Sequence, residues 1–272
     1  MPPVSTAPRW AQLLAEAVER PGLLLEAYHR FPGYSLGNQV AALSQCQARN
    51  IPPGPIGTLK RWNTLGRTVV KGQKALWLCM PVTVREKLAG HNSSADGTEG
   101  ADPTDRPTRR VYLWKPYWFV LAQTNGPAPP PELPQPEWSK ARALEALNIT
   151  EIPFDHPDGN MQGFALGRMV AVNPIAEAPW KTLFHEIGHI LLGHVQPGGD
   201  GGDMPRSLSE AEAEAVALLC LDTLELPGAE YARGYIQHWY GHDAALPERS
   251  AVRIFKVADT ILKAGAVPQL LM

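Results

Sequence analysis

The stretch WKTLFHEIGHILLGH, residues 180–194, predicts a buried helix that carries two histidines on one face. His185 and His189 are four residues apart, so their imidazoles project about one turn from each other and both can reach one metal ion. Glu186 stands beside them, where it can accept a proton from a water molecule at the metal. The surrounding apolar residues recur at helical spacing and are Leu183, Phe184, Ile187, Ile190, Leu191 and Leu192. The stretch therefore indicates a metal site, with His185 and His189 as ligands and Glu186 as the catalytic base.

A third ligand is expected from the segment that follows, residues 207–221. Sites that hold two histidines in this way take a third protein ligand from a later helix and leave one position open for water. Glu210 and Glu214 share one face of the expected helix, while Glu212 points away from it. We expect Glu210 to be the ligand and Glu214 to orient a ligand histidine, with the two roles open to exchange. In a competing interpretation Ser207 and Glu210 form a capping box and the other glutamates are solvated.

The remaining histidines are weaker candidates for metal binding. His194 lies five residues past His189, about 140° round a helix from it, where a capping or surface residue is more common. His238 and His242 are not expected to bind a metal. The metal expected at the site is divalent, Zn²⁺ in the first place and Mn²⁺ as the alternative.

Charge is divided unevenly along the 272 residues. Residues 1–125 hold 15 Lys and Arg against 8 Asp and Glu, whereas residues 126–272 hold 10 against 19, so net charges of +7 and −9 give the −2 of the whole chain. No acidic residue occurs between Glu26 and Glu86. Solvated surfaces normally mix both signs, so a one-sign stretch of this length favours contact with phosphates.

Side chains in and near this basic stretch predict binding of single-stranded DNA. Five cations can neutralise phosphates, and they are Lys60, Arg61, Arg67, Lys71 and Lys74. Trp62 stands among them in an expected loop and is the strongest candidate for stacking on an unpaired base. Asn38 is either a base contact or a helix-surface residue. Further aromatic residues lie on the expected strand pair, and most of them are expected in the core. Any that are exposed could also stack on unpaired bases: Trp77, Tyr112, Trp114, Tyr117 and Trp118.

The first half of the chain predicts helices followed by a strand pair. Apolar spacing and helix-breaking residues place helices at about 6–20, 23–31 and 35–49, and β-rich stretches at 75–84 and 111–123 predict an antiparallel pair. Residues 86–110 are rich in Gly, Ser, Asp, Thr and Pro and predict a mobile insertion. NGPAPPPELPQP, residues 125–136, predicts a semi-rigid proline-rich linker, placed at 126–137.

The second half predicts mostly helices. They are expected at 138–147, at about 179–194 and 207–225, and as a C-terminal pair that begins near Tyr231 and Ser250, with a hairpin region ending near 170–172. The fold class is therefore α+β. We expect a helical and antiparallel-sheet domain at residues 1–125 and a mainly helical domain with a small sheet at 138–272.

Composition excludes several classes of protein. The apolar share of 44% and the charged share of 19% exclude a coiled coil and a wholly disordered chain. No apolar run approaches the ~20 residues needed to cross a bilayer, and the first residues lack the apolar region of a signal peptide. Cys46, Cys79 and Cys220 are far apart and odd in number, which excludes a disulfide framework and suits a reducing compartment. We therefore expect a cytoplasmic protein without a membrane partner.

Taken together, these motifs resemble a known family over nearly the whole chain. The first half is similar to the N-terminal single-stranded-DNA-binding domain of ArdC-type antirestriction proteins, in Phe31, Tyr34-Ser35, Asn38, Gly57, Trp62, LGRTVVKGQKA (residues 65–75), Pro81 and Gln123 to Gly126. The second half resembles the accompanying zincin-like (gluzincin) metallopeptidase domain of the ImmA/IrrE type, in the HExxH motif, the Glu210-x-x-Ala213-Glu214-x-x-Ala217 pattern and Tyr235 to Tyr240.

This resemblance implies DNA binding in the first domain, a divalent metal in the second, and protection of incoming plasmid or phage DNA from restriction. The leading hypothesis is a single-stranded-DNA-binding antirestriction-type protein with a metallopeptidase-like site. If the site is an active peptidase, a protein substrate is also expected. One alternative is a DNA-binding shield in which the metal is structural. Another is a cytoplasmic metallopeptidase that cleaves a repressor and recruits it through the basic face.

Overall fold

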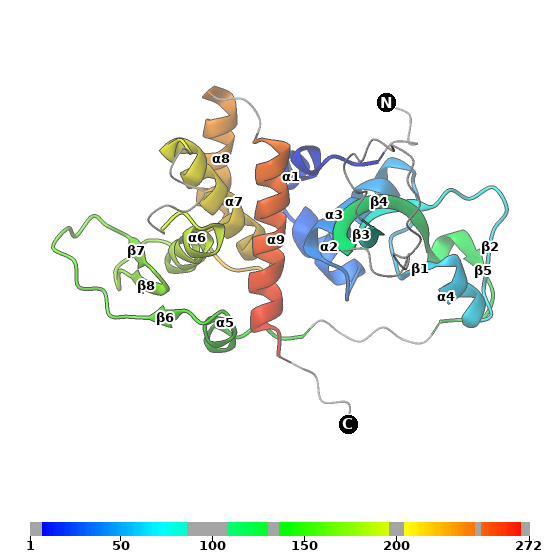
Figure 1. Ribbon diagram of the computed structural model, residues 1–272, viewed down its shortest axis with the longest axis horizontal. Helices are drawn as coiled ribbons and strands as arrows, with labels where there is room; N and C mark the ends of the chain where they lie inside the picture. The colour runs from blue at the N-terminus through cyan, green and yellow to red at the C-terminus, as the bar shows by residue number, and fades with distance from the viewer. Residues whose placement is uncertain (1–6, 86–107, 130–135, 196–203, 243–245, 268–272) are drawn as a thin grey trace, which may run out of the picture.

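The computed structural model describes residues 7–85, 108–129, 136–195, 204–242 and 246–267, which form an α+β fold (Figure 1). The fold class expected from the sequence is therefore confirmed. The predicted insertion at 86–110 lies outside the described residues except for its last three, and the predicted linker at 126–137 is described only at its ends. Among the described helices none is long and apolar enough to cross a membrane.

The first half begins with three helices, α1 (Trp10–Glu19), α2 (Leu23–Arg30) and α3 (Leu36–Ala48), as the sequence predicts. The predicted strand pair is confirmed as β3 (Leu76–Arg85) antiparallel to β4 (Thr108–Val120), and β1 (Ile56–Thr58) pairs with the other edge of β4. Smaller elements are α4 (Leu59–Thr64), β2 (Thr68–Val69), the 3₁₀ helix η1 (Leu121–Gln123) and β5 (Thr124–Asn125), which pairs with β2. Helix α4 corrects the sequence prediction of a loop around Trp62.

The second half holds α5 (Lys140–Ala146) and a three-stranded sheet of order β6-β8-β7, made of β6 (Thr150–Glu151), β7 (Gly163–Leu166) and β8 (Met169–Val172). Four helices follow, α6 (Pro179–Leu192), α7 (Arg206–Thr223), α8 (Ala229–His242) and α9 (Glu248–Gly265). All four agree with the predicted helices to within a few residues. The small sheet lies against α6, which places β7 beside the histidine motif.

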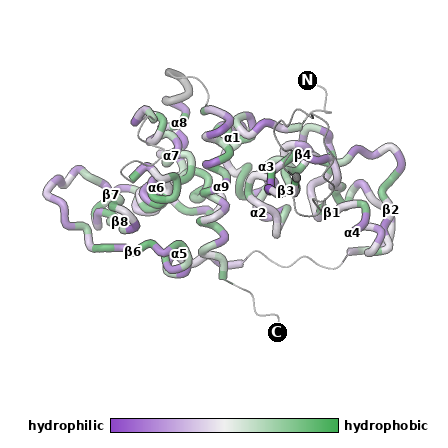
Figure 2. Tube along the Cα trace, viewed as in Figure 1, coloured by the Kyte–Doolittle hydropathy of each residue, from purple (hydrophilic) through white to green (hydrophobic). Residues whose placement is uncertain are grey.

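Helix α9 occupies the middle of the molecule, with α6, α7 and α8 on one side and α1, α2 and α3 on the other (Figure 1). Its sequence alternates apolar and charged residues at helical spacing, so it buries one side against both groups of helices. Helix α7 is buried along most of its length, and Figure 2 shows hydrophobic stretches of α6, α7 and α9 at the centre. One continuous hydrophobic core therefore includes residues from both halves of the chain.

Acidic residues of α9 cap the helices of the first half. The Glu248 carboxylate accepts hydrogen bonds from the backbone N–H groups of Trp10, at 2.7 Å, and Ala11, at 3.0 Å, which begin α1. Asp259 accepts one from Leu36 N–H, at 2.9 Å, where α3 begins. Neither α1 nor α3 has a cap from its own N-cap side chain, so α9 supplies the missing acceptors. The proposed division into domains at 1–125 and 138–272 stays a prediction.

Candidate metal centre

Helix α6 presents His185 and His189 from its buried side. Pro179 begins the helix, where its fixed φ is favourable, and Gly193 ends it in a left-handed conformation at φ 80°. Gly188, between the histidines, lets α7 approach closely, since a side chain there would meet Ala213 Cα at 3.3 Å. Because α7 lies this close to α6, Glu210 and Glu214 of α7 reach the two histidines.

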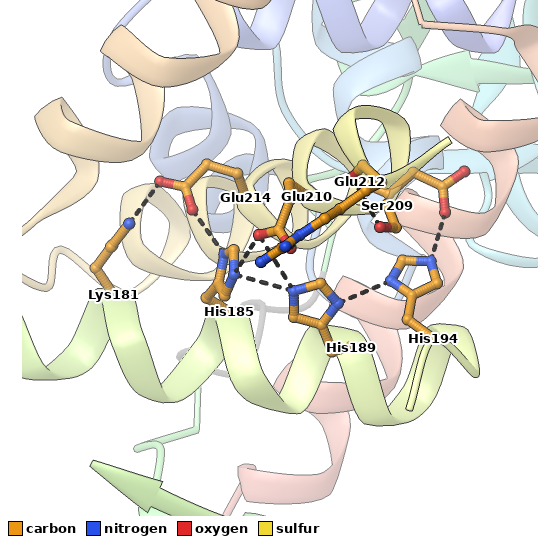
Figure 3. Close-up of polar contacts among 9 residues, drawn as sticks. Lys181, His185, His189, His194, Ser209, Glu210, Glu212 and Glu214 are labelled. Atoms are coloured by element: carbon orange, nitrogen blue, oxygen red, sulfur yellow. Dashed lines mark hydrogen bonds and ion pairs between the residues drawn. The ribbon is translucent and has the colours of Figure 1, made fainter. Parts of the chain in front are cut away.

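Three ligand atoms converge where α6 and α7 meet (Figure 3). The Nε2 atoms of His185 and His189 are 3.0 Å apart, and Glu210 Oε2 lies 3.3 Å from the first and 3.6 Å from the second. Two imidazoles and one carboxylate at this separation can hold one divalent metal ion and leave a further position open. Glu210 is one-third exposed, so the open side of the cluster faces solvent.

Glu214 lies behind His185, on the side away from the three converging atoms. Its Oε2 is 2.7 Å from His185 Nδ1, and its Oε1 forms an ion pair with Lys181 Nζ at 3.0 Å. The carboxylate is almost fully buried. This geometry favours Glu210 as the ligand and Glu214 as the residue that orients His185, which is the first of the two assignments that the sequence leaves open. It does not favour the competing interpretation, in which Glu210 caps the helix and the other glutamates are solvated, because Glu210 lies at the two histidines and Glu212 and Glu214 are buried.

Electrostatics favour a cation at this position. Burial alone would lower the pKa of His185, but hydrogen bonds with Glu210 and Glu214 outweigh it and raise the pKa to about 9. The two imidazoles, first of all the one of His185 at 3.3 Å, hold the pKa of Glu210 well below its usual range. A metal ion would replace the proton that His185 otherwise holds there.

Glu186 lies next to the cluster on α6 and is half-buried. Its Cγ would lie 3.6 Å from a side chain at Gly163, so the absence of a side chain on β7 leaves room beside it. Burial raises the pKa of this carboxyl, which makes it a stronger base once it is ionised. Within the described part of the chain Glu186 makes no hydrogen bond to another side chain, which leaves its oxygens available to water or a substrate.

His194 and Glu212 lie against the histidine cluster, although the sequence predicts a capping or surface position for His194 and a Glu212 that points away. His194 Nδ1 is 3.0 Å from His189 Nδ1, and His194 Nε2 is 3.1 Å from Glu212 Oε2. Their side chains are 4% and 0% exposed, so neither is a solvated surface residue. Gly193 turns the chain back after α6 and places His194 against His189. A glycine directly before that histidine is the signal from which its position could have been inferred.

The remaining candidate residues of the second half lie on α8. Tyr235 of α8 is 43% exposed, and burial and then the charges of Glu210 and Glu214 raise its pKa, so a protonated phenol lies near these carboxylates. His238 is exposed on α8 and is not part of the cluster of ligand atoms found among the described residues. The side chain of His242 lies outside the described residues.

Three of the expected DNA contacts are structural residues. Trp62 is 2% exposed, because α4 folds over β4 and its indole N–H donates to Phe119 O at 2.9 Å. Arg67 is buried, and its guanidinium donates to four oxygens of residues 124–127. The Asn38 amide exchanges two hydrogen bonds with the backbone of Cys79. Stacking by Trp62 and phosphate contact by Arg67 are therefore wrong predictions, and Asn38 has its amide satisfied within the protein.

Four of the expected cations do face solvent, namely Lys60, Arg61, Lys71 and Lys74. On β4, Tyr112 is 67% and Tyr117 is 50% exposed, and Arg109 and Arg110 are also exposed. Trp77, Trp114 and Trp118 are partly buried, and Trp114 packs against Trp10 with ring centroids 4.7 Å apart. The exposed rings of this half are therefore tyrosines of the strand pair rather than Trp62.

Fold and site together define an α+β protein with a helix-borne HExxH cluster completed by a glutamate from the next helix. Solved structures that share this fold include two of one protein. The metal-free crystal structure of antirestriction protein ArdC from plasmid R388 superposes with a TM-score of 0.53 at 16% identity, over 94% of this chain and 97% of that one. The Mn(II)-bound structure of ArdC gives 0.50 at 16% identity, over 96% and 99%. No protein-family model matches the sequence, and no curated protein matches it significantly. The ArdC-like fold expected from the motifs is therefore confirmed.

Proposed function

We propose that this chain is a metal-dependent antirestriction protein with a site of the metallopeptidase type. The observation that carries the proposal is the convergence of His185 Nε2, His189 Nε2 and Glu210 Oε2 within 3.0–3.6 Å of one another. Glu186 lies beside these atoms with its oxygens available. The shared fold supports the same role, since the neighbour of this fold is described as an antirestriction protein and has a Mn(II)-bound structure.

Each polar residue of the site has a separate task in this proposal. His185, His189 and Glu210 hold the metal, which when bound polarises a water or a carbonyl group. Glu186 accepts the proton from the attacking water and passes it to the leaving group. Tyr235, with its phenol protonated, can donate a hydrogen bond to an oxygen on the open side. Zn²⁺ suits two imidazoles and a carboxylate, and Mn²⁺ is the alternative.

Metal analysis of the full-length protein tests the site. His185→Ala, His189→Ala and Glu210→Ala should each lose stoichiometric metal, and Glu214→Ala should weaken binding by about 10–100-fold, as expected for a residue that orients a ligand. His29→Ala, which changes an exposed histidine of α2, is the matched control and should keep the metal. Full metal content in both His185→Ala and His189→Ala would remove the site from consideration. Elemental analysis of the wild type also identifies which metal is bound.

We further propose that the first half binds single-stranded DNA through solvent-facing residues. The cations Lys60, Arg61, Lys71 and Lys74 can neutralise phosphates, and Tyr112 and Tyr117 present rings on which unpaired bases can stack. Changing Lys71 and Lys74 to Glu in the full chain should weaken binding and flatten its salt dependence, because fewer counterions are released. Tyr112→Ala should lower affinity by about 1–3 kcal/mol without changing that slope. Equal affinity for duplex and single strand would contradict this proposal.

Glu186→Gln separates this function from its alternatives. If hydrolysis is required, the variant should keep both metal and DNA but lose any protection of unmodified DNA that enters a restricting host. A variant that protects as well as the wild type would favour a DNA-binding shield with a structural metal. If the basic residues instead recruit a protein substrate, such as a repressor, oligonucleotides should compete with its cleavage.

A further inference from the structure

A chain of hydrogen-bonding groups extends from His189 into the protein interior. His189 Nδ1 faces His194 Nδ1 at 3.0 Å, and His194 Nε2 faces Glu212 Oε2 at 3.1 Å (Figure 3). Arg253 of α9 lies with Nη1 3.6 Å from the same Glu212 oxygen. Glu212 is fully buried, and the ligand role proposed for the site does not use it.

The geometry of this chain determines where each proton lies. Two imidazole nitrogens that face each other at 3.0 Å can form a hydrogen bond only if one of them carries a proton and the other accepts it. Glu212, beside the Arg253 guanidinium, is an acceptor, so His194 carries its proton on Nε2. The Nδ1 atom of a neutral His194 is then an acceptor, and His189 must donate from its own Nδ1.

We propose that His194 is a positioning residue that transmits the acceptor character of Glu212 to His189 and holds His189 in the tautomer that can bind a metal. With its proton on Nδ1, His189 has a free electron pair on Nε2, the atom that faces His185 and Glu210. This inference rests on the proposed metal site. His194 and Glu212 would then orient His189 as Glu214 orients His185.

Glu214 and Glu212 both come from α7, but only Glu214 contacts its histidine directly. Glu214 reaches His185 Nδ1 directly at 2.7 Å, whereas Glu212 reaches His189 only through the ring of His194. The left-handed Gly193 turns the chain so that His194 N–H donates to His189 O at 2.9 Å, which fixes the ring beside its target. Glutamates at 210, 212 and 214 therefore serve as ligand, indirect support and direct support.

Metal affinity of two His194 variants tests the proposal. His194→Phe keeps a ring but removes both nitrogens, and the dissociation constant for Zn²⁺ or Mn²⁺ should rise by about 10–100-fold. His194→Gln offers one amide oxygen as acceptor and one amide NH₂ as donor, so it should restore affinity to within a few-fold of the wild type. A residue that only fills space would be replaced better by phenylalanine than by glutamine. Equal affinity in both variants, or weaker binding in the glutamine variant, would overturn the proposal.

Glu212→Gln provides the second variant, which keeps the shape of the side chain and removes its charge. It should weaken metal binding on its own, and it should add nothing to the loss in His194→Phe, because Glu212 acts through His194. Additive losses would show that the two residues act independently and would contradict the proposed chain. Should His194→Phe not fold, the tautomer of His189 in the metal-free wild type tests the proposal without it.

The tautomer of His189 can be read without any metal. In the metal-free wild type, the ¹⁵N shifts of the His189 ring should show a protonated Nδ1 and an unprotonated Nε2. His194→Phe should give a mixture of tautomers, and His194→Gln should keep the wild-type pattern. Protonation on Nε2 in the wild type would overturn the inference. Since this readout needs no metal, it distinguishes failure of the tautomer assignment from failure of the proposed metal site.

Discussion

Metal-free protein should lose stability as the pH rises, because His185 is held in its charged form. Hydrogen bonds with Glu210 and Glu214 raise the pKa of His185 to about 9, against an ordinary value of 6.5. The folded state therefore binds the proton more tightly than the unfolded state does. The resulting stabilisation is fully present below pH 6.5, and it is lost progressively as the pH rises from 6.5 through about 9.

The size of the effect follows from the difference between the two pKa values. The difference between a pKa of 6.5 and one of about 9 corresponds to about 3 kcal/mol of unfolding free energy. The His185 side chain is only 15% exposed, so solvent screening reduces this value little. Urea unfolding of the full chain in the presence of a chelator, at pH 6 and at pH 9.5, measures the difference directly.

His185→Ala is the control for every other group that titrates in this range. The difference between the wild-type and variant profiles isolates the contribution of His185. In the metal-bound wild type this loss should disappear. Metal and proton compete for the same nitrogen, so the dissociation constant of the metal should fall about tenfold per pH unit between about 6.5 and 9, which offsets the lost stabilisation by the proton. Parallel pH profiles for metal-free wild type and His185→Ala would refute the electrostatic account of this histidine.

Three further predictions concern the framework around the candidate site and the first half of the chain. Trp62→Ala should destabilise the protein by about 3–5 kcal/mol in thermal or urea unfolding, since the ring is buried, and the folded fraction should bind single-stranded DNA as the wild type does. Glu248→Ala and Asp259→Ala should each cost about 0.5–2 kcal/mol, with the largest losses of amide-exchange protection at the starts of α1 and α3. Gly163→Ala should destabilise β7, since the added carbon would lie 2.7 Å from Ala171 O. Both the thermal stability and the metal affinity of this variant should be lower than those of the wild type.

The candidate ligand pair could be predicted from the sequence because helix geometry alone puts His185 and His189 on one face. The choice between Glu210 and Glu214 could not, since both lie on one face of α7 and only the placement of α7 against α6 distinguishes them. That placement depends on Gly188, whose missing side chain lets Ala213 approach. Periodicity within one helix gives no information about such contact between two.

The residues that the sequence places at a DNA contact show a different limit of prediction. Trp62 and Arg67 stand in a basic stretch, where composition favours exposed side chains that contact nucleic acid. Their burial comes from partners almost sixty residues away, since Trp62 donates to Phe119 O and Arg67 to Thr124. A local pattern cannot anticipate that β4 and β5 return beside this stretch. Charge therefore identifies the half of the chain that is rich in cations, but not which of its side chains remain exposed.

Helix α9 joins the two halves of the chain through direct contacts. Its Glu248 and Asp259 cap helices of the first half, while Arg253, five residues after Glu248, lies beside Glu212 at the candidate metal site. A helix is stiff over such a length, so these contacts depend on one rigid element. The N-terminal helices and the support of His189 are therefore held in place by the same C-terminal helix, although the sequence separates them by more than half of the chain.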